Sequence, residues 1–417
     1  MDMRPSPRQQ ELMDRAYKLA VERFAPRAAQ HDREASFPTD DYADLHASGL
    51  LALCVPEKYG GLGADFETYC LVAEQIARGN ASTALTYNMH ALTMLMMGPL
   101  TDGLELPPDV RERHEELSAR RYREVVEQGV FYGQPHSEPV ESGSADQLQV
   151  GGRRFGTRAE WVDGGYLVNG RKFFVSLAGA AQYYATPALL VGDGPWEDRT
   201  LYLAIPRDAP GVEFTGEWDP LGMRATVSRD MTLKDVRVPA DAEILPPGVF
   251  GKLYQRRPHL FLGFSATFLG LMQAAYDVTI AYLTGKVPGA PGLQEEAPAR
   301  GYAVAEMLFT LEATRALYYR AISEERLDPP VACLQRARAA HVQVQQAVVH
   351  LTAEAIRVCG GRAILKRYPL ERYYRDARAS AVMRPWTQDI ATQQAWETAL
   401  ASARSPEPAA EPRTLKV

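Results

Sequence analysis

Apolar residues recur at helical spacing along the first third of the chain, over residues 7–128. In the stretch 9–27 they fall close to the 3.6-residue period of an α-helix, at Leu12, Ala16, Leu19, Ala20 and Phe24. A second apolar stretch, 81–100, is rich in methionine and predicts a helix buried in the core, with His90 inside it. The pattern therefore predicts an N-terminal helical region.

Between residues 130 and 245 the pattern changes to that of β-strands. Residues 201–205 (LYLAI) form a short apolar run that ends at Pro206, and apolar and polar residues alternate over 226–238. Turn-forming residues at 220–222 (PLG) precede this alternating run. This part of the chain is predicted to form a β-domain.

From residue 253 helical periodicity returns in four long segments, which glycine and proline separate: 257–285, 298–325, 331–358 and 370–400. Four helices with short connections predict an antiparallel bundle. The chain is thus predicted to be an α+β multidomain protein. It would contain an N-terminal α-helical domain, a middle β-barrel-like domain, a C-terminal four-helix bundle and a disordered tail, over residues 1–129, 130–246, 247–402 and 403–417.

Composition and charge argue against several classes of function and location. The 417 residues carry a formal net charge of −6, so no basic surface argues for nucleic acid. No run approaches the roughly 18 apolar residues of a membrane span, and the N-terminus lacks the apolar core of a signal peptide. Four cysteines lie far apart and fit no metal-binding or redox spacing: Cys54, Cys70, Cys333 and Cys359. We expect reduced thiols, no metal site and a cytoplasmic location.

The middle region contains a polar loop followed by a β-rich segment. The loop, 137–146 (SEPVESGSAD), includes a glycine that allows backbone amides to approach an acceptor. In the later segment, YLVNGRKFFVS, the pair Asn169-Gly170 lies between two β-rich runs and predicts a hairpin. Beyond that turn, alternation puts Phe174 and Ser176 on the same face as Lys172. A flat ligand with polar edges would meet a ring, a hydroxyl and amide groups there.

These two motifs resemble the flavin-binding β-domain of acyl-CoA dehydrogenases. That family has Thr-Glu-Pro-x-x-Gly-Ser-Asp followed by Asn-Gly-x-Lys-x-Trp/Phe-Ile-Thr/Ser. Other motifs resemble the same family, at 55–63 (VPEKYGGLG), 219–224 (DPLGMR), 360–361 (GG) and 375–377 (RDA). The resemblance covers nearly the whole chain, from about residue 8 to 400, and implies the fold of that family.

The resemblance also implies an FAD cofactor, with FMN left open, and an acyl thioester oxidised between its α and β carbons with hydride transfer to flavin N5. Ser137 and the amide of His136 would meet the pyrimidine edge of the flavin. Ser144 would contact the FAD pyrophosphate or the substrate. Phe174 would stack on the ring, and Ser176 would lie near N5. Electron-transfer flavoprotein is the redox partner that such a reaction would use.

A second group of residues is implied to bind the FAD of a neighbouring subunit. Gly360 and Gly361 would hold its adenosine half, so the chain would form a homo-oligomer, a dimer or a tetramer. Lys286 stands where the family has an arginine, and Arg357 stands where it usually has a glutamine. Lysine keeps the charge but lacks the bidentate fork of arginine.

The catalytic base of the family has no match in this chain. It is usually a glutamate eight residues beyond the aspartate of the Arg-Asp-Ala motif, and counting from Asp376 gives Arg384, which stays protonated. A minority of the family takes its glutamate from the first bundle helix, at or near Leu260 here, yet 258–268 holds no carboxylate. The catalytic group is therefore unknown, with His90 and His136 as candidates.

Three functions stay open on the sequence alone. The first is a dehydrogenase of acyl-CoA or a carrier-bound thioester that uses a displaced base. The second is a monooxygenase on the same fold, which takes reduced flavin from a separate flavin reductase and needs a dry cavity with a donor, such as His or Ser, to protect a C4a-peroxide on a hydrophobic substrate. The third is a flavin-binding member that has lost catalysis.

Overall fold

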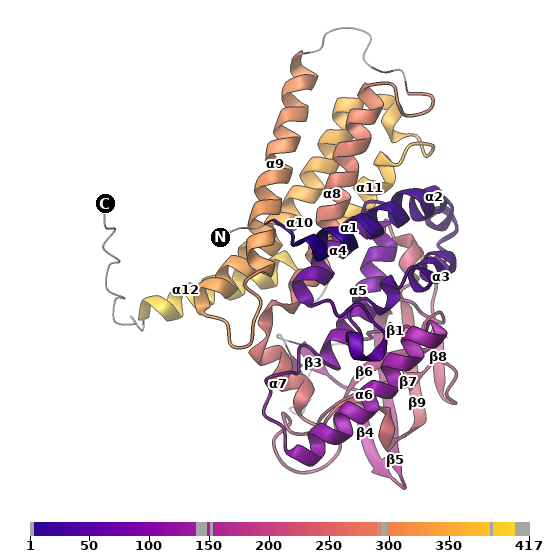
Figure 1. The fold of residues 1–417 in the computed structure, drawn as a ribbon, viewed down its shortest axis with the longest axis vertical. Helices are drawn as coiled ribbons and strands as arrows, with labels where there is room; N and C mark the ends of the chain where they lie inside the picture. The colour runs from indigo at the N-terminus through magenta and orange to yellow at the C-terminus, as the bar shows by residue number, and fades with distance from the viewer. Residues whose placement is uncertain are drawn as a thin grey trace.

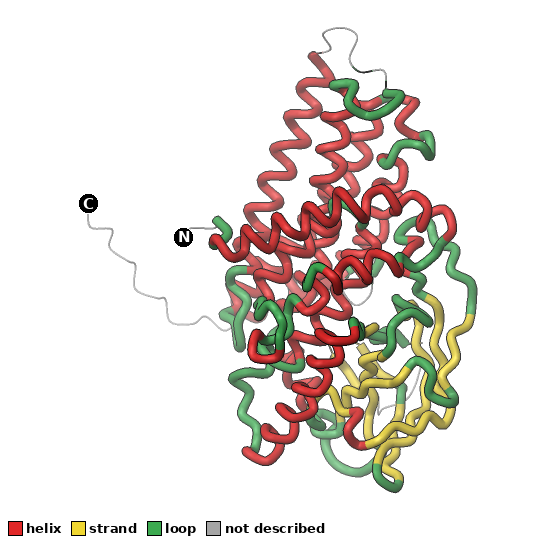
Figure 2. The backbone as a smooth tube through the Cα atoms, turned by 45° about the vertical axis from the view of Figure 1, so that its right-hand side comes forward, coloured by secondary structure: helices red, strands yellow, loops and turns green. Residues whose placement is uncertain are grey.

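The computed structural model describes most of the chain: residues 4–138, 148–150, 153–290, 292, 298–383 and 387–404. Figure 1 shows three parts that follow one another in sequence. N-terminal helices cross the middle of the molecule, a β-sheet lies below them, and long helices form the upper part. Figure 2 shows the same division, with the strands gathered on one side of the helices. The predicted fold class is confirmed, and the exact domain boundaries remain predictions.

The N-terminal part is helical, as its periodicity predicts. Its helices are α1 (Pro7–Leu19), α2 (Ala25–Glu34), α3 (Thr39–Ala47), α4 (Phe66–Ala77), α5 (Ala81–Met96) and α6 (Pro108–Gln128), and a π-helical turn, Ala20–Phe24, joins α1 to α2. Ser6 begins α1 because its hydroxyl accepts from the amide of Gln9, at 3.2 Å. Every residue of α5 is buried, which confirms the predicted core helix.

A mixed sheet forms the middle part. Its strands are β1 (Tyr132–Gly133), β4 (Arg158–Val162), β5 (Gly165–Val175), β6 (Tyr183–Leu190), β7 (Thr200–Pro206), β8 (Val212–Thr215), β9 (Arg229–Pro239) and β10 (Glu243–Leu245). Their order is β10-β7-β6-β4-β5-β9-β8, with β1 paired to β6. A separate pair consists of β2 (Leu148–Val150) and β3 (Arg153–Phe155). Most neighbours are antiparallel, whereas β1 and β4 run parallel to β6.

The predicted hairpin at Asn169-Gly170 is wrong. Strand β5 runs straight through this pair, and the tight turn lies earlier, at Asp163-Gly164, where Gly164 has φ 74°. The pair instead coincides with a register shift between β5 and β9. A Cβ on Gly170 would lie 2.4 Å from the hydroxyl oxygen of Thr157. The glycine is therefore needed for close packing inside the sheet rather than for a turn.

Five helices form the bundle region, after the short helix α7 (Val249–Arg256). They are α8 (Leu262–Leu283), α9 (Pro298–Ile322), α10 (Val331–Cys359), α11 (Leu370–Arg378) and α12 (Gln388–Arg404). The predicted fourth segment, 370–400, is thus not one helix. Helix α11 ends at Arg378, a 3-10 turn follows over Ala379–Ala381, and α12 begins at Gln388. Pro385, which lies between them in the sequence, disfavours one continuous helix over 370–400. Figure 1 shows α12 pointing away from the other helices.

The three parts of the chain meet at one residue, Asp32 in α2. The guanidinium of Arg375 in α11 donates to both of its oxygens, at 2.9 and 2.6 Å. Arg224, from the loop before β9, donates to the Asp32 backbone carbonyl at 2.7 Å. Beside this junction the amide of Met223 donates to Asp376 of α11, at 2.6 Å. The loop before β9 is therefore attached to both helical parts.

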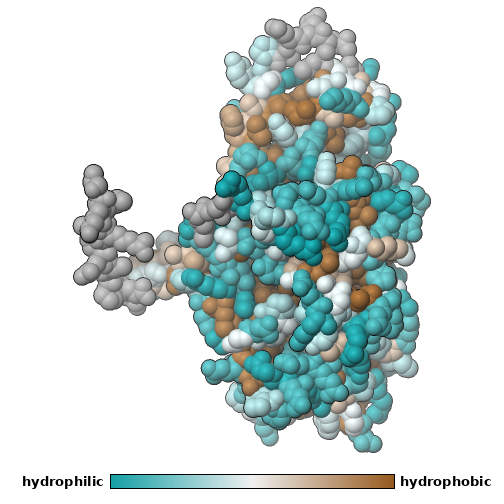
Figure 3. All heavy atoms as spheres, in the orientation of Figure 1, coloured by the Kyte–Doolittle hydropathy of each residue, from teal (hydrophilic) through white to brown (hydrophobic). Residues whose placement is uncertain are grey.

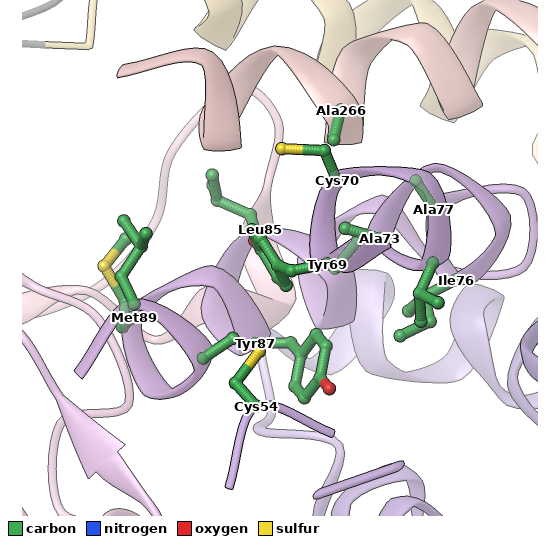
Figure 4. Close-up of a cluster of buried hydrophobic side chains, with 14 of the residues drawn as sticks. Cys54, Tyr69, Cys70, Ala73, Ile76, Ala77, Leu85, Tyr87, Met89 and Ala266 are labelled. Carbon is green, nitrogen blue, oxygen red and sulfur yellow. The ribbon is translucent and has the colours of Figure 1, made fainter. Parts of the chain in front are cut away.

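One hydrophobic core extends through the N-terminal helices, the main sheet and the bundle region. Figure 4 shows part of it between α4, α5 and α8, where Cys70 faces Ala266 and Tyr69 lies near Tyr87. Cys54, Cys70 and Cys359 are buried, Cys333 is half-buried, and all four thiols are free. The free thiols agree with the expected reduced cysteines, and the three buried ones belong to the core.

The surface is mixed. Figure 3 shows hydrophilic residues over most of one face, with hydrophobic residues gathered on the upper part of the bundle. On α9, Tyr302 and Phe309 are 74% and 67% exposed. Within the described ranges, none of the helices combines the length and the apolar character that crossing a bilayer requires.

Gly360 ends α10 in a conformation that favours glycine, with φ 84° and ψ −178°. We expect Gly360→Ala to lower the free energy of unfolding by about 1 to 2 kcal/mol, because a side chain at these angles is strained. Urea denaturation would measure the loss. Gly361→Ala is the matched control, since an added Cβ there meets open space and no positive φ is involved. Equal losses in the two variants would contradict this explanation.

Candidate functional site

A cavity of about 800 Å³ lies where the sheet, helix α5 and the bundle region meet. Its polar lining consists of Gln134, His136, Ser137, Glu138, Ser176, Thr226, Ser228, Arg375 and Arg378. Its other walls are mainly apolar, from Leu85, Met89, Leu92, Phe173, Phe174, Trp218, Pro220, Leu221, Gly222, Met223, Tyr254, Leu260, Phe264, Ala379, Val382 and Met383. The structure thus brings four predicted site residues, His136, Ser137, Phe174 and Ser176, into one cavity.

Phe174 forms an exposed aromatic wall of this cavity. It lies near the end of β5, is 69% exposed, and has a backbone φ of 50°. This positive φ breaks the predicted alternation, because Lys172 and Val175 are both buried while Phe174 faces the cavity. The edge of Trp218 lies against it, with ring centroids 6.3 Å apart. A strained backbone at this point presents the ring to a ligand.

Ser176 belongs to a short series of hydroxyl groups along the cavity wall. Its Oγ lies 2.9 Å from that of Ser228, which lies 2.8 Å from the Oγ1 of Thr226. We call Ser176, Ser228 and Thr226 the hydroxyl chain. Sequence reasoning missed the last two members, although a Thr-x-Ser pair two residues apart in a β-rich stretch is a signal that could have found them.

His136 lies at the opposite wall among aromatic rings. Its Nε2 is 3.2 Å from the hydroxyl of Tyr202, and the rings of Phe250 and Tyr254 contact it edge-on, with centroids 5.5 and 6.3 Å away. Its backbone amide, expected to meet a flavin edge, donates to the carbonyl of Gln134 at 3.0 Å. The amide and the imidazole of His136 thus both have partners within the protein, and the residue lines the cavity.

Glu138 is the one carboxylate among the described residues that line the cavity. It forms a buried ion pair with Lys172, with side chains 2% and 0% exposed. It also accepts from the hydroxyl of Thr157 at 2.5 Å and from the amide of Gly156. Lys172 donates in addition to the carbonyl of Pro187 at 2.9 Å. These contacts attach the segment with Ser137 and Glu138, which we call the cavity loop, to the sheet. They also supply the Glu138 carboxylate with a counter-charge and hydrogen-bond donors.

The structure does not bring His90 to the cavity. The side chain is completely buried in α5, and its Nε2 lies 2.8 Å from the carbonyl of Leu51. Burial lowers its pKa to about 4. Leu260, at the alternative position for a glutamate, lines the cavity and is 2% exposed. Arg384 and Ser144 lie outside the described residues.

The residues expected to meet a neighbouring subunit's FAD lie at one end of the bundle, away from the cavity lining. Lys286 is exposed after α8, and Arg357 is exposed near the end of α10, where it pairs with Glu354 at 2.5 Å. The loop with Lys286 contacts the loop after Gly360, since the hydroxyl of Tyr368 donates to the carbonyl of Gly289 at 2.6 Å. Their role in cofactor binding remains a prediction.

Two arginines of α11 reach the cavity with different surroundings. Arg375 is held by Asp32 and by Glu371, whose Oε2 is 2.8 Å from its Nε. These neighbours raise the pKa of the Arg375 guanidinium. Arg378, at the end of the same helix, is exposed. The guanidinium of Arg375 is thus balanced by two carboxylates, whereas Arg378 brings an exposed positive charge to the cavity lining.

The residues present fit a flavin ring. A cavity of about 800 Å³ lies within the range of small-molecule pockets, and Phe174 offers an aromatic face. The indole Nε1 of Trp218 is a buried donor that has no hydrogen-bond partner in the part of the chain that the structure describes. The same part holds no group of three His, Cys, Asp or Glu side chains suited to a metal ion.

Phe174→Ala is expected to weaken flavin binding without weakening the fold. The ring is 69% exposed in the cavity, so its loss removes a contact with the flavin but little core packing. We expect the Kd for FMN or FAD to rise about tenfold, measured by fluorescence titration. Trp161→Ala is the control, because Trp161 is also exposed (59%) and lies outside the cavity lining. A loss of stability in place of affinity would contradict the assignment.

Comparisons with known proteins agree over most of the chain. Family models of the acyl-CoA dehydrogenase N-terminal, middle and C-terminal domains match residues 6–101, 145–236 and 262–384. The putative acyl-CoA dehydrogenase YdbM of Bacillus subtilis (strain 168) is 29% identical over 376 residues, which cover 89% of this chain and 92% of YdbM. The mitochondrial short-chain specific acyl-CoA dehydrogenase of Bos taurus is 28% identical over 87% of this chain and 83% of its own.

Solved structures share the same fold. KijD3 in complex with FMN and dTDP-3-amino-2,3,6-trideoxy-4-keto-3-methyl-D-glucose has a TM-score of 0.77 and 26% identity, over 97% of this chain and 96% of that one. Butyryl-CoA dehydrogenase from Megasphaera elsdenii has a TM-score of 0.78 and 21% identity, over 96% and 100%. This chain belongs to the acyl-CoA dehydrogenase family.

Proposed function

We propose that this protein is a flavin-dependent monooxygenase, which inserts one oxygen atom into an apolar substrate and receives reduced flavin from a separate reductase. One observation carries the proposal: the described lining of the cavity offers no carboxylate for removing an α-proton. Glu138 is bound to Lys172 and Thr157, and Leu260 occupies the alternative position for the base. Oxidation of a thioester between its α and β carbons needs such a base.

The overall reaction balances without a protein base. Substrate, O2, two electrons and two protons yield the oxygenated substrate and one water molecule. Bound reduced flavin would supply the two electrons and the activation of dioxygen. The protein contributes a mainly apolar cavity, from which a bound flavin and substrate would displace water, and it positions His136 and the hydroxyl chain at its walls. His136, with Tyr202 beside its Nε2, can hold a proton at the reacting centre.

KijD3 supports this proposal. At 26% identity its structure holds FMN together with a nucleotide-linked aminosugar, so this fold accommodates flavin beside a ligand that is not a thioester. Its cofactor also favours FMN as a candidate next to FAD. The cavity walls of this chain, from α5, α8 and the loop before β9, would accept an apolar group of the substrate.

Acyl thioester dehydrogenation is the second candidate, because the curated relatives named here are acyl-CoA dehydrogenases. It would need a carboxylate from outside the described lining, and electron-transfer flavoprotein would be its expected partner. A flavin-binding protein without catalysis is the third, and it would show neither reaction.

Two measurements on the flavin-loaded protein separate these functions. In the first, a panel of acyl-CoAs is added without oxygen, and flavin absorbance at 450 nm is followed. In the second, a flavin reductase with NADH supplies reduced flavin in air, indole serves as an apolar test substrate, and products are searched for an added oxygen atom by mass spectrometry. We expect no bleaching in the first and oxygenated product in the second. Bleaching by any thioester would overturn the proposal.

A further inference from the structure

The hydroxyl chain ends on a group that cannot donate a hydrogen bond. Ser176 contacts Ser228 at 2.9 Å, and Ser228 contacts Thr226 at 2.8 Å. The hydroxyl of Thr226 then donates to the backbone carbonyl of Met223, at 2.9 Å. A carbonyl oxygen only accepts, so the last contact has one possible direction.

That direction determines the other two. Each hydroxyl has one proton, and the chain contains three hydroxyls and three contacts. Because the hydroxyl proton of Thr226 is donated to the carbonyl of Met223, Ser228 must donate to Thr226. Ser228 then has no proton left for Ser176, so Ser176 must donate to Ser228. The arrangement that forms all three hydrogen bonds therefore leaves Ser176 without a proton for the cavity.

The surrounding backbone keeps this arrangement in place. The amides of Leu177 and Ala178 donate to the carbonyls of Thr226 and Val227, at 3.0 and 3.1 Å. Thr226 and Ser228 are 1% and 7% exposed, so water has little access to compete for their hydroxyls. Val227 is held at φ 45°, a costly angle for a β-branched side chain, which indicates that the segment has one well-determined conformation.

We propose that Ser176 presents only hydrogen-bond acceptor lone pairs to the cavity, and that it selects a ligand atom that carries a proton. The proposal rests on the proposed function, with Ser176 near flavin N5. Reduced flavin has an N–H at N5, which donates to Ser176. Oxidised flavin has a bare nitrogen at N5, whose lone pair would face those of Ser176. The site is therefore adapted to bind reduced flavin more tightly than oxidised flavin.

Three substitutions test the direction of the chain. Ser228→Ala removes the acceptor of Ser176, so the Ser176 proton becomes free to turn into the cavity. Thr226→Val frees the proton of Ser228 to donate to Ser176, with the same effect by another route. Ser176→Ala removes both donor and acceptor. Ser118→Ala is the control, since its buried hydroxyl donates to the carbonyl of Met97 and neither residue lines the cavity.

The measurements are the Kd values of oxidised and reduced FMN, the latter under anaerobic conditions, and the midpoint potential of bound FMN. We expect the ratio of oxidised to reduced Kd to fall about tenfold in Ser228→Ala and in Thr226→Val relative to the unmodified protein. A tenfold change corresponds to a potential lower by about 30 mV for a two-electron couple. Ser176→Ala is expected to give an intermediate ratio, and Ser118→Ala an unchanged one.

The outcomes separate this inference from the proposed function. An unchanged ratio in Ser228→Ala, with flavin still bound, would overturn the inference alone. The expected ratios combined with bleaching by thioesters would overturn the monooxygenase proposal alone. Failure of the unmodified protein to bind either form of FMN or FAD would overturn both. If a variant does not fold, the other two still decide, because they act on different members of the chain.

Discussion

Replacing Lys172 by methionine is expected to lower the free energy of unfolding by about 3 to 5 kcal/mol, the largest effect predicted for a single side chain here. Lys172 and Glu138 are buried, and the ammonium also donates to the carbonyl of Pro187. Methionine fills the volume of the lysine side chain but carries no charge. The buried Glu138 carboxylate would keep its hydrogen bonds from Thr157 and Gly156 but lose its counter-charge. Chemical denaturation would measure the loss. Flavin binding should weaken too, because Glu138 lies on the cavity loop.

A double-mutant cycle shows whether the pair itself is responsible. Glu138→Gln alone should also destabilise the fold, since it leaves the ammonium of Lys172 buried without its counter-charge. The double variant should be more stable than the sum of the two losses predicts, because neither charge is then left alone. Additive losses would mean that the two groups do not depend on each other.

Gly222→Ala is expected to destabilise the protein by about 3 kcal/mol and to disturb the cavity at the same time. An added Cβ would lie 2.3 Å from the carbonyl oxygen of Arg375 and 2.6 Å from the amide nitrogen of Asp376. Both atoms belong to the backbone of α11, so no side chain can rotate away and the helix itself must shift. Thermal unfolding and flavin affinity should therefore change together.

Gly251→Ala provides the comparison. There the nearest atoms to an added Cβ are 3.7 Å away, an ordinary contact, and the residue lies in helix α7. Alanine favours helix relative to glycine, so this variant should be neutral or slightly more stable. If Gly222→Ala is as well tolerated as Gly251→Ala, α11 does not pack on the loop as closely as described.

The spacing of apolar residues was sufficient to predict the helical regions, because each long helix repeats its buried face over several turns. The Asn-Gly hairpin failed for a different reason. Asn169-Gly170 lies on β5, which pairs with β4 on one side and β9 on the other, so the local turn preference is overridden by two neighbouring strands. The real turn, Asp163-Gly164, carries an Asp-Gly pair, which is an equally good local turn signal.

The candidate site was predicted in part. His136, Ser137, Phe174 and Ser176 do line one cavity, but alternation alone would place Phe174 beside Lys172. The positive φ at Phe174 turns its side chain away from that of Lys172, and no sequence pattern predicts such an angle for a phenylalanine. His90 was a reasonable candidate by residue type, yet whether a histidine on an apolar helix faces a cavity or the core depends on tertiary packing.

Strain is unevenly distributed in this molecule. The described chain holds seven non-glycine residues at positive φ, and four of them lie on or next to the cavity wall: Phe174, Leu177, Met223 and Val227. Each costs free energy that the surrounding contacts offset. This concentration explains why local rules worked well for the scaffold and less well for the site.

The junction at Asp32 has a consequence for how the protein unfolds. A single carboxylate receives Arg375 of the C-terminal part, and the carbonyl of the same residue receives Arg224 of the middle part. The N-terminal part therefore cannot separate from the C-terminal part or from the middle part without breaking one of these contacts. The three parts should therefore melt in one calorimetric transition, and an excised part should be less soluble than the whole, because its share of the junction would be left without a partner.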